Sequence, residues 1–449
     1  MYLKLLVNTE RIRHVTLHPK QLEELGLRSG AHKEVRFGLR SALVQIEADK
    51  EVNERAIVLS EDIVNLLRIP LCCRYQLKML NDVLAIGPFI SFLTSPKNKT
   101  NQRYIHQLRD YLSHYDQIGG AVLAFALEGV NQRTMTIDGY LYNPQTQEWQ
   151  HGTYPFPSVI FIRGYVSSQK WIDYFKRMLG KRAIFNDFYL DKWEMYNLLS
   201  HNEELRSYLP TTAIYKTPAS IRRFLKKHTE AYLKPVDGTM GISVMKGALT
   251  KSGFTIRYRK DDQNKKHVFV RFPMATKFLQ RSLQSQKYII QQAIPLITYH
   301  KKLIDFRLIV VKNGSGKWEY MGMIARYGAQ NSVVSNISAG GYAEKGEDAL
   351  QKALFLTEEE TKAQAEKMAD LAIRIADYLD ATGLHCGNMG IDLGVEPNGR
   401  IWIIEIQHYS PAHSIALDAN QQEMYRRILL NNMLYMKRLS GFSEGGKPC

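Results

Sequence analysis

One segment restricts the possible folds of this chain more than any other. It is "MGIDLGVEPNGRIWIIEIQ" (389–407), in which Asn398-Gly399 separates two apolar runs. An Asn-Gly pair between apolar runs is the strongest short signal for a β-hairpin, because both residues tolerate the positive φ angles of a tight turn. The chain is therefore expected to contain an antiparallel sheet built on this hairpin.

The same hairpin carries polar side chains at positions that the turn fixes. With Asn398-Gly399 as the turn, Pro397 pairs with Arg400 and Asp392 lies opposite Glu405. Because side chains alternate along a strand, one face receives three oxygen-bearing side chains, namely Asp392, Glu405 and Gln407. The other face is expected to receive three apolar side chains, namely Trp402, Ile404 and Ile406.

Carboxylate and amide oxygens are ligands that Mg²⁺ prefers. The hairpin therefore predicts a metal site at Asp392, Glu405 and Gln407. The alternative is a half-exposed hairpin whose polar face is only solvated.

Length and composition set wide limits. A chain of 449 residues is long enough for about two to four domains. Its apolar runs are strand-sized and its start is too short for a secretory signal, so we expect a cytoplasmic protein with no membrane span. The four cysteines show no metal-ligand spacing and are expected to be free thiols. The net charge of +16 suggests an anionic partner, or a solvated basic face.

The first 86 residues contain two similar segments. The segments 15–37 and 57–79 align apolar with apolar at an offset of 42, and each reads strand, short helix, strand. Two half-units that cannot bury their faces alone could interlock as a small barrel-like domain. The alternative is chance similarity in a β-rich segment.

Two further regions follow. Residues 87–180 alternate buried strands, such as "VLAIGPFISFL", with a helical pattern, which indicates a Rossmann-like α/β domain. From 181 to 440 the pattern changes to α+β, and 441–449 is expected to be a flexible tail. A helix should begin after Thr357, where "TEEE" forms a capping box, and end near Leu379.

Several basic and glycine-containing motifs precede the hairpin. "AYLKPVDGTMGISVMKG" places Lys234 before a loop with Gly238 and Gly241, which allows backbone amides to approach a phosphate; a simple hairpin turn is the alternative. Lys192 begins a helix. "DFRLIVV" and "MIARYGAQNSVVSNISAGG" place Arg307 and Arg326 beside apolar strands, where each needs an anionic partner.

Taken in order, these motifs resemble the ATP-grasp superfamily. They are Lys192, K-P-x-x-G-x-x-G, Q-Q-x-I, D-x-R, R with N-x-x-x-G-G, and D followed thirteen residues later by E-x-Q. More narrowly, "EIQHYSPAHSIAL" is similar to the end of the YheC/YheD-like branch associated with the endospore coat. The resemblance covers about 181 to 440 and implies an ATP-grasp fold with the preceding α/β domain usual in that superfamily.

The resemblance also implies roles for matching residues. Arg307, Arg326 and Asn336 would be catalytic, and Asp392, Glu405 and Gln407 would bind Mg²⁺. ATP would contact two lysines, a glycine loop and the stretch that reads adenine, namely Lys192, Lys234, Gly238, Thr239, Met240, Gly241, Gln291, Gln292, Ala293 and Ile294. Gln407 stands where the family usually has asparagine, so its amide oxygen lies one methylene further out and weaker or shifted Mg²⁺ binding, with lower activity, is expected.

The implied activity is an ATP- and Mg²⁺-dependent ligase joining a carboxylate to an amine or thiol through an acyl phosphate. Small-molecule or peptide-like acids and amines would be its substrates, in sporulation or spore coat formation. The alternative is a non-catalytic or weakly active ATP-binding protein of the spore coat, held to acidic coat polymers or coat proteins. Nucleic acid is not an expected partner, and a kinase is a third alternative.

Overall fold

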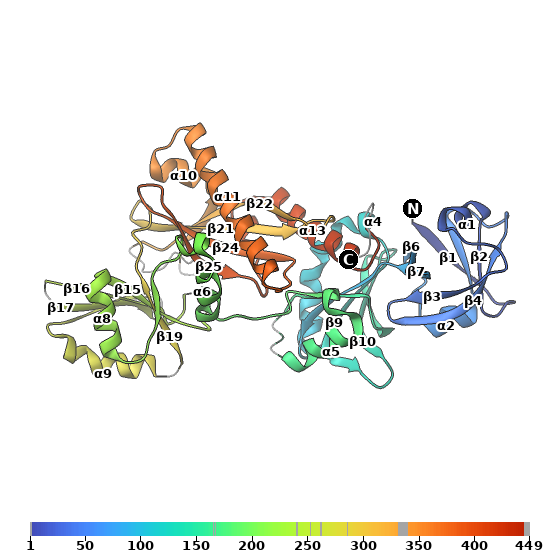
Figure 1. Ribbon diagram of the computed structural model, residues 1–449, viewed down its shortest axis with the longest axis horizontal. Coiled ribbons are helices and arrows are strands. Elements are labelled where there is room, and N and C mark those ends of the chain that lie inside the picture. The colour runs from blue at the N-terminus through green and yellow to red at the C-terminus, as the bar shows by residue number, and fades with distance from the viewer. Residues whose placement is uncertain are drawn as a thin grey trace.

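The computed structural model describes residues 2–164, 166, 168–238, 241–251, 253–260, 263–284, 286–330 and 340–443. Figure 1 shows the chain as an elongated molecule, with the N-terminal strands at one end and the sheet of β15, β16 and β17 at the other. None of the described helices is both long enough and apolar enough to cross a bilayer.

The N-terminal segment folds as a closed barrel in the order β1-β5-β2-β4-β3-β7-β6. The two similar segments occupy equivalent elements, β2-α1-β3 and β5-α2-β6. Each helix ends in a left-handed residue, Gly26 and Arg68, which are 42 positions apart. The bounds are β1 Leu3–Asn8, β2 His14–Leu17, α1 Pro19–Leu25, β3 His32–Phe37, β4 Arg40–Ala48, β5 Ala56–Ser60, α2 Glu61–Leu67, β6 Arg74–Leu80 and β7 Val83–Gly87.

A sheet in the order β11-β10-β9-β8-β12-β13 follows. Strands β8, β9, β12 and β13 are parallel, and every residue of β8 is buried, as expected for a strand covered on both faces. The strands are β8 Phe89–Ser95, β9 Ala121–Asn131, β10 Thr136–Asn143, β11 Glu148–Pro155, β12 Val159–Ile162 and β13 Ile184–Phe185. The helical segments are α3 Asn98–Tyr104, η1 Ile105–His114, α4 Tyr115–Ile118, α5 Gln169–Leu179 and η2 Lys181–Ala183.

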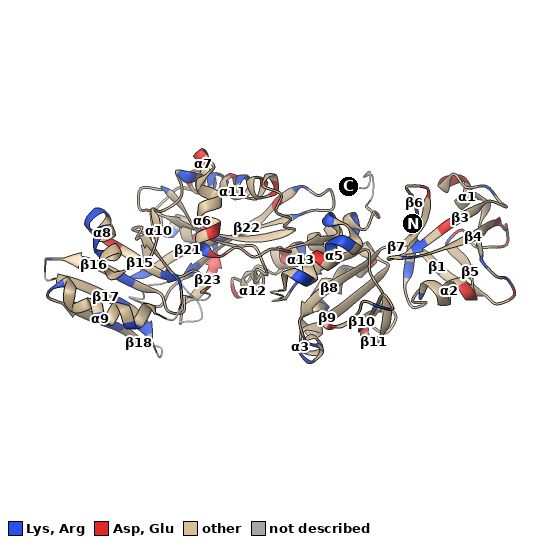
Figure 2. Cartoon of the chain, turned by 60° about the horizontal axis from the view of Figure 1, so that its bottom comes forward, with Lys and Arg blue, Asp and Glu red and all other residues tan. Residues whose placement is uncertain are grey.

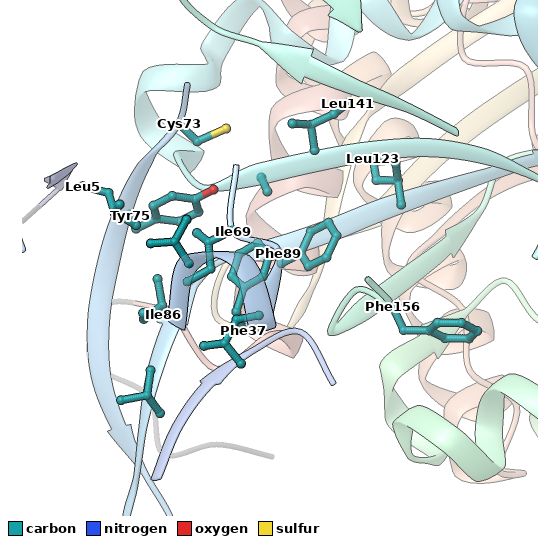
Figure 3. Close-up of a cluster of buried hydrophobic side chains, with 14 of the residues drawn as sticks. Leu5, Phe37, Ile69, Cys73, Tyr75, Ile86, Phe89, Leu123, Leu141 and Phe156 are labelled. Atoms are coloured by element: carbon teal, nitrogen blue, oxygen red, sulfur yellow. The ribbon is translucent and has the colours of Figure 1, made fainter. Parts of the chain in front are cut away.

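The barrel and this sheet share one hydrophobic core. Figure 3 shows Phe37 and Tyr75 of the barrel beside Phe89 of β8. The rings of Phe37 and Phe89 stack with centroids 4.7 Å apart, and Tyr75 meets Phe37 edge-on at 5.6 Å. This continuous packing fixes the barrel against its neighbour.

Helix α13 (Gln422–Leu439) returns to the same sheet. Its Leu429, Met433 and Met436 are buried in one cluster with Ile90 and Phe92 of β8. Phe442, in the segment expected to be a flexible tail, is also buried and packs against Leu80 and Ala85 of the barrel. Positions 444–449 lie outside the described residues.

Two antiparallel sheets form the remainder. The first has the order β14-β19-β15-β16-β17-β18, and the second has β23-β22-β21-β24-β25 with β20 paired to β21. Their strands are β14 Thr212–Ile214, β15 Glu230–Pro235, β16 Met245–Thr250, β17 Gly253–Lys260, β18 Gln263–Phe269, β19 Tyr288–Gln292, β20 Thr298–Tyr299, β21 Lys302–Lys312, β22 Trp318–Tyr327, β23 Tyr342–Lys345, β24 Asn388–Val395 and β25 Ile401–Gln407.

Helices cover the outer faces of these sheets. The pair α8 and α9 packs on the first sheet, and α10 and α11 pack on the second. The capping box at Thr357 is confirmed, although the helix continues to Ala381. The helices are α6 Lys192–Ser200, α7 Glu203–Arg206, α8 Pro218–His228, α9 Phe272–Leu283, α10 Gly346–Leu354, α11 Glu358–Ala381 and α12 Ile415–Asp418.

Candidate functional site

A cavity of about 620 Å³ lies between the two antiparallel sheets. Pockets for small molecules typically measure about 300–1,000 Å³, so this one is large enough for a nucleotide-sized ligand. It is lined by most of the residues that the sequence singled out, namely Lys192, Lys234, Gly238, Gly241, Gln291, Gln292, Ile294, Arg307, Arg326, Asp392, Glu405 and Gln407. Thr239, Met240 and Asn336 lie outside the described residues.

One wall of the cavity supplies two amines. Lys192 is the first residue of α6, where Asp191 caps the helix by accepting from the amides of Trp193 and Glu194. The Lys192 Nζ lies 3.1 Å from Oε1 of Glu405 and donates to the carbonyl of Gly238. Lys192 therefore turns inward and connects β25 to the loop that follows β15.

The second amine, Lys234, lies on β15. Its Nζ donates to Oε1 of Gln291 at 2.6 Å and lies 5.4 Å from the ring centroid of Tyr232. Burial lowers the pKa of Lys234 to about 8, although the carboxylate of Glu405 favours the charged form. The amine is thus held in a site where its charge is costly unless an anion neutralises it.

The opposite wall is the predicted hairpin, and Asp392 pairs with Glu405 as expected. The loop that produces this pairing differs from the predicted two-residue turn. The outermost pair is Val395 with Ile401, so the loop is five residues long, and a β-bulge between Asp392 and Leu393 restores the register. The bulge inserts one extra residue into β25, which corrects the one-residue offset of the loop.

The bulge also changes which residues face the core. Ile401, Ile403 and Ile406 are buried in the core beneath the sheet, whereas Ile404 lines the cavity beside Glu405. The prediction that Ile404 shares the core face with Ile406 is therefore wrong, because the inserted residue breaks the strict alternation. Trp402 is buried, and its Nε1 donates to Glu396 in the loop.

The two arginines find their anionic partners within the protein. Arg307 forms a two-bond ion pair with Asp392, and Nη2 of Arg326 lies 2.8 Å from Oδ2 of the same carboxylate. Arg326 also donates twice to Asp305, each time at 2.7 Å. Burial would raise the pKa of Asp392, but Arg307 and Arg326 outweigh it and hold the pKa below its usual value.

This network depends on a glycine next to it. Gly390 pairs with Gln407 across the hairpin. A β-carbon at Gly390 would lie 2.8 Å from Cδ of Arg307, closer than packed atoms tolerate. Glycine therefore leaves the space in which the guanidinium reaches Asp392.

The predicted metal ligands are brought to one cavity, but they do not form a ready-made cage. Among the described residues, no cluster of three or more His, Cys, Asp or Glu side chains could hold a metal ion. Asp392 is engaged by two arginines, while Glu405 and Gln407 are half-buried at the cavity wall. Since Mg²⁺ commonly uses one or two carboxylates plus phosphates and water, this donor set fits Mg²⁺ only together with a phosphate ligand.

In the stretch predicted to read adenine, two backbone amides are already hydrogen-bonded within the protein. The amides of Gln292 and Ala293 donate to the carbonyls of Thr211 and Glu230, at 2.8 and 3.2 Å. Ala293 is not part of the cavity wall, whereas Ile294 is. Of the predicted backbone contacts, those near Ile294 remain candidates.

Some lining residues were missed. Tyr232 lies two residues before Lys234 on the same strand face, so strand alternation could have identified it. Asp418 follows the hairpin, and no pattern in the sequence indicated that it reaches the cavity. His408 accepts a hydrogen bond from the amide of Leu190 at 3.0 Å, and burial lowers its pKa to about 4.

The fold and this site define the class of protein. Residues 181–439 match the sequence model of the YheC/D like ATP-grasp family, and the chain belongs to that family. This confirms the predicted resemblance, and the α+β part of the chain has the ATP-grasp fold.

Individual relatives are known. The chain is 24% identical over 423 residues to the endospore coat-associated protein YheD of Bacillus subtilis (strain 168), covering 90% of this chain and 89% of YheD. It is also 24% identical over 319 residues to the endospore coat-associated protein YheC of the same strain, covering 68% of this chain and 85% of YheC.

Solved structures are similar at lower identity. The D-cycloserine synthetase DcsG is 13% identical with a TM-score of 0.44, and the match covers 77% of this chain and 99% of that one. The D-alanine-D-alanine ligase from Coxiella burnetii is 10% identical with a TM-score of 0.43, covering 78% of this chain and 97% of that one.

Proposed function

We propose that the chain is an ATP- and Mg²⁺-dependent ligase that joins a carboxylate to an amine or thiol. One observation carries this proposal: two amines, from helix α6 and strand β15, line the same cavity as acids of the second antiparallel sheet. Lys192 and Lys234 lie opposite Glu405 and Asp392 there. A triphosphate with Mg²⁺ is the ligand whose charges match both walls.

On nucleotide binding, the two lysines of the cavity would exchange their present partners for phosphate oxygens. Lys192 now neutralises Glu405, and Lys234 is satisfied by Gln291. Phosphate oxygens would take over both amines, which frees the Glu405 carboxylate to bind Mg²⁺. Lys192 therefore keeps Glu405 neutralised until the nucleotide arrives.

A smaller pocket of about 100 Å³ adjoins the cavity and shares Lys192, Lys234 and Gln291 with it. Its other walls are largely apolar and include Leu199, Leu209 and Ile289. We propose that the adenine ring enters this pocket and not the part of the cavity near Ile294, since a flat aromatic base gains most from apolar walls. Of the predicted adenine contacts, Gln291 borders this pocket.

Arg307 and Arg326 would act at the γ-phosphate end of the bound nucleotide. ATP, when bound, supplies the γ-phosphate that activates a substrate carboxylate as an acyl phosphate. Arg307 and Arg326 are held in place by Asp392 and Asp305, so their charge is oriented before any substrate binds. Fixed donors of this kind stabilise developing negative charge without reorganisation, and no protein nucleophile is needed.

A second candidate is an ATP-binding protein of the spore coat with little or no turnover. Two observations favour it: Gln407 replaces the family's usual asparagine, and Asp392 is already saturated by two arginines. The matching relatives carry the name endospore coat-associated proteins. Under this candidate, nucleotide binds and stabilises the fold without acceptor-dependent hydrolysis.

The test has two stages. Mg-ATP at a hundred times its dissociation constant should stabilise the protein by about 2.7 kcal/mol in thermal unfolding. Glu405→Gln should abolish this effect, whereas Glu366→Gln on the exposed face of α11 should leave it intact. ADP release should then require both an acid and an amine from a substrate panel; nucleotide binding without any such release would favour the second candidate.

A further inference from the structure

The net charge of the chain is concentrated in one part of the fold. Residues 212–292, which span the sheet from β14 to β19, contain 17 Lys and Arg against 4 Asp and Glu, a net charge of +13 in a chain of +16. Figure 2 shows blue segments on α8, α9 and β18 of this part. Lys234 of the cavity accounts for one of these charges, so the proposed nucleotide does not explain the excess.

Three of these cations stand side by side on the sheet. The register places Tyr232 opposite Lys246, Lys246 opposite Arg257, and Arg257 opposite Lys266, across strands β15 to β18. This row begins at Tyr232 in the wall of the cavity. It occupies the face that α8 and α9 leave uncovered, because their core is formed by the alternate residues, such as Leu233 and Ile256.

Such an arrangement is costly for an isolated sheet. Like charges directly opposite each other on neighbouring strands destabilise the pairing. Lys246 is compensated by Glu230, whose Oε2 lies 2.7 Å from its Nζ. Within the part of the chain that the structure describes, neither Arg257 nor Lys266 has an ion-pair partner, and both are exposed. The opposed pair Arg257 and Lys266 thus violates a local rule without compensation, which indicates an external anion.

The edge of this sheet indicates which kind of anion binds beside the row. Strand β18 is the last strand in the order, so one side of its backbone has no strand partner among the described residues. Unpaired strand edges bind another extended polypeptide through main-chain hydrogen bonds. Val268, 51% exposed, lies two residues after Lys266 on the same face and offers an apolar contact. None of the residues that β16, β17 and β18 place on this face is aromatic, whereas single-stranded nucleic acids are usually held by stacking.

We propose that strand β18 and the row Lys246, Arg257 and Lys266 form a docking surface for an acidic polypeptide segment. The segment adds to the edge of β18 as an extended strand and places its carboxylates beside Arg257 and Lys266. This surface lies outside the nucleotide contacts and does not depend on the proposed ligase activity, because docking is measured without ATP.

The experiment uses the full chain and a fluorescein-labelled nonapeptide in which Thr and Glu alternate, so that all carboxylates share one strand face. We expect fluorescence anisotropy to detect binding that weakens with salt. The double variant Arg257→Glu/Lys266→Glu should bind about tenfold more weakly, since two attractions become repulsions. An N-methylated version of the peptide should also bind more weakly, because it cannot donate main-chain hydrogen bonds.

The matched control is Arg222→Glu/Arg223→Glu, which changes the net charge equally at exposed positions of α8. It should bind the peptide as the unmodified chain does. Equal loss in both double variants would overturn the proposal, because the peptide would then sense only net charge. Tighter binding of a thymidine pentanucleotide of equal charge would overturn it in favour of nucleic acid. Circular dichroism and thermal unfolding verify that both variants fold.

Discussion

The affinity for Mg-ATP should depend on pH through Lys234. Burial lowers the pKa of this amine to about 8 in the ligand-free protein. At pH 7 about 90% of the amines are charged, and at pH 9 about 10% are. If only the charged form binds the triphosphate, the dissociation constant rises about tenfold between these pH values, which is about 1.4 kcal/mol.

Isothermal titration calorimetry at pH 7, 8 and 9 measures this change directly. Lys234→Arg keeps its charge over the whole range and should give an affinity that does not vary with pH. Lys246→Met, on the neighbouring strand, should keep the pH dependence of the unmodified chain. In thermal unfolding at fixed Mg-ATP, a stabilisation of about 2.7 kcal/mol at pH 7 should fall to about 1.4 kcal/mol at pH 9.

The ligand-free protein should behave in the opposite way. Between pH 8 and 10.5 the unfolded chain binds more protons at Lys234 than the folded chain does, because the pKa is lower in the folded state. The free energy of unfolding then gains a contribution that grows with pH in this window. The reasoning is refuted if binding is equally tight at pH 7 and 9, or if Lys234→Arg retains the pH dependence.

Three further predictions concern other positions. Gln407→Asn shortens the amide by one methylene and should lower the Mg²⁺ concentration needed for half-maximal ADP release several-fold; a higher requirement would show that the glutamine geometry is already suitable. Gly390→Val should displace Arg307 and cost about 1–3 kcal/mol in urea unfolding, together with loss of turnover, whereas unchanged activity would exclude the predicted clash. Phe442→Ala should cost about 3 kcal/mol of stability in the same assay. Phe355→Ala should cost almost nothing, because that ring is 92% exposed, and equal effects of the two would contradict the packing argument.

Much of the site could be predicted because strand alternation and turn chemistry are local. The opposition of Asp392 and Glu405 followed from the Asn-Gly signal, even though the loop is longer than expected. The bulge that restores this register could not be predicted, since no residue pattern in β25 marks where an extra residue is inserted. Ile404 was assigned to the wrong face for that reason.

The arginines illustrate a different limit. Their position beside apolar strands correctly indicated that each needs an anion, but the sequence does not show that Asp392 and Asp305 supply it. Similarly, the basic clusters of 212–292 are visible in the sequence, whereas the row through Arg257 and Lys266 depends on the register of three strand pairs. Charge can be counted in a sequence, but its alignment across strands requires the fold.

The return of α13 to the sheet of β8 has a consequence for synthesis. About 340 residues separate Phe92 from Met433, which share one core cluster, so at roughly 5–20 residues per second a ribosome needs on the order of tens of seconds to deliver the second after the first. During that interval the apolar side chains that α13 later covers stay exposed to solvent. They are then a natural target for a chaperone that shields nascent chains.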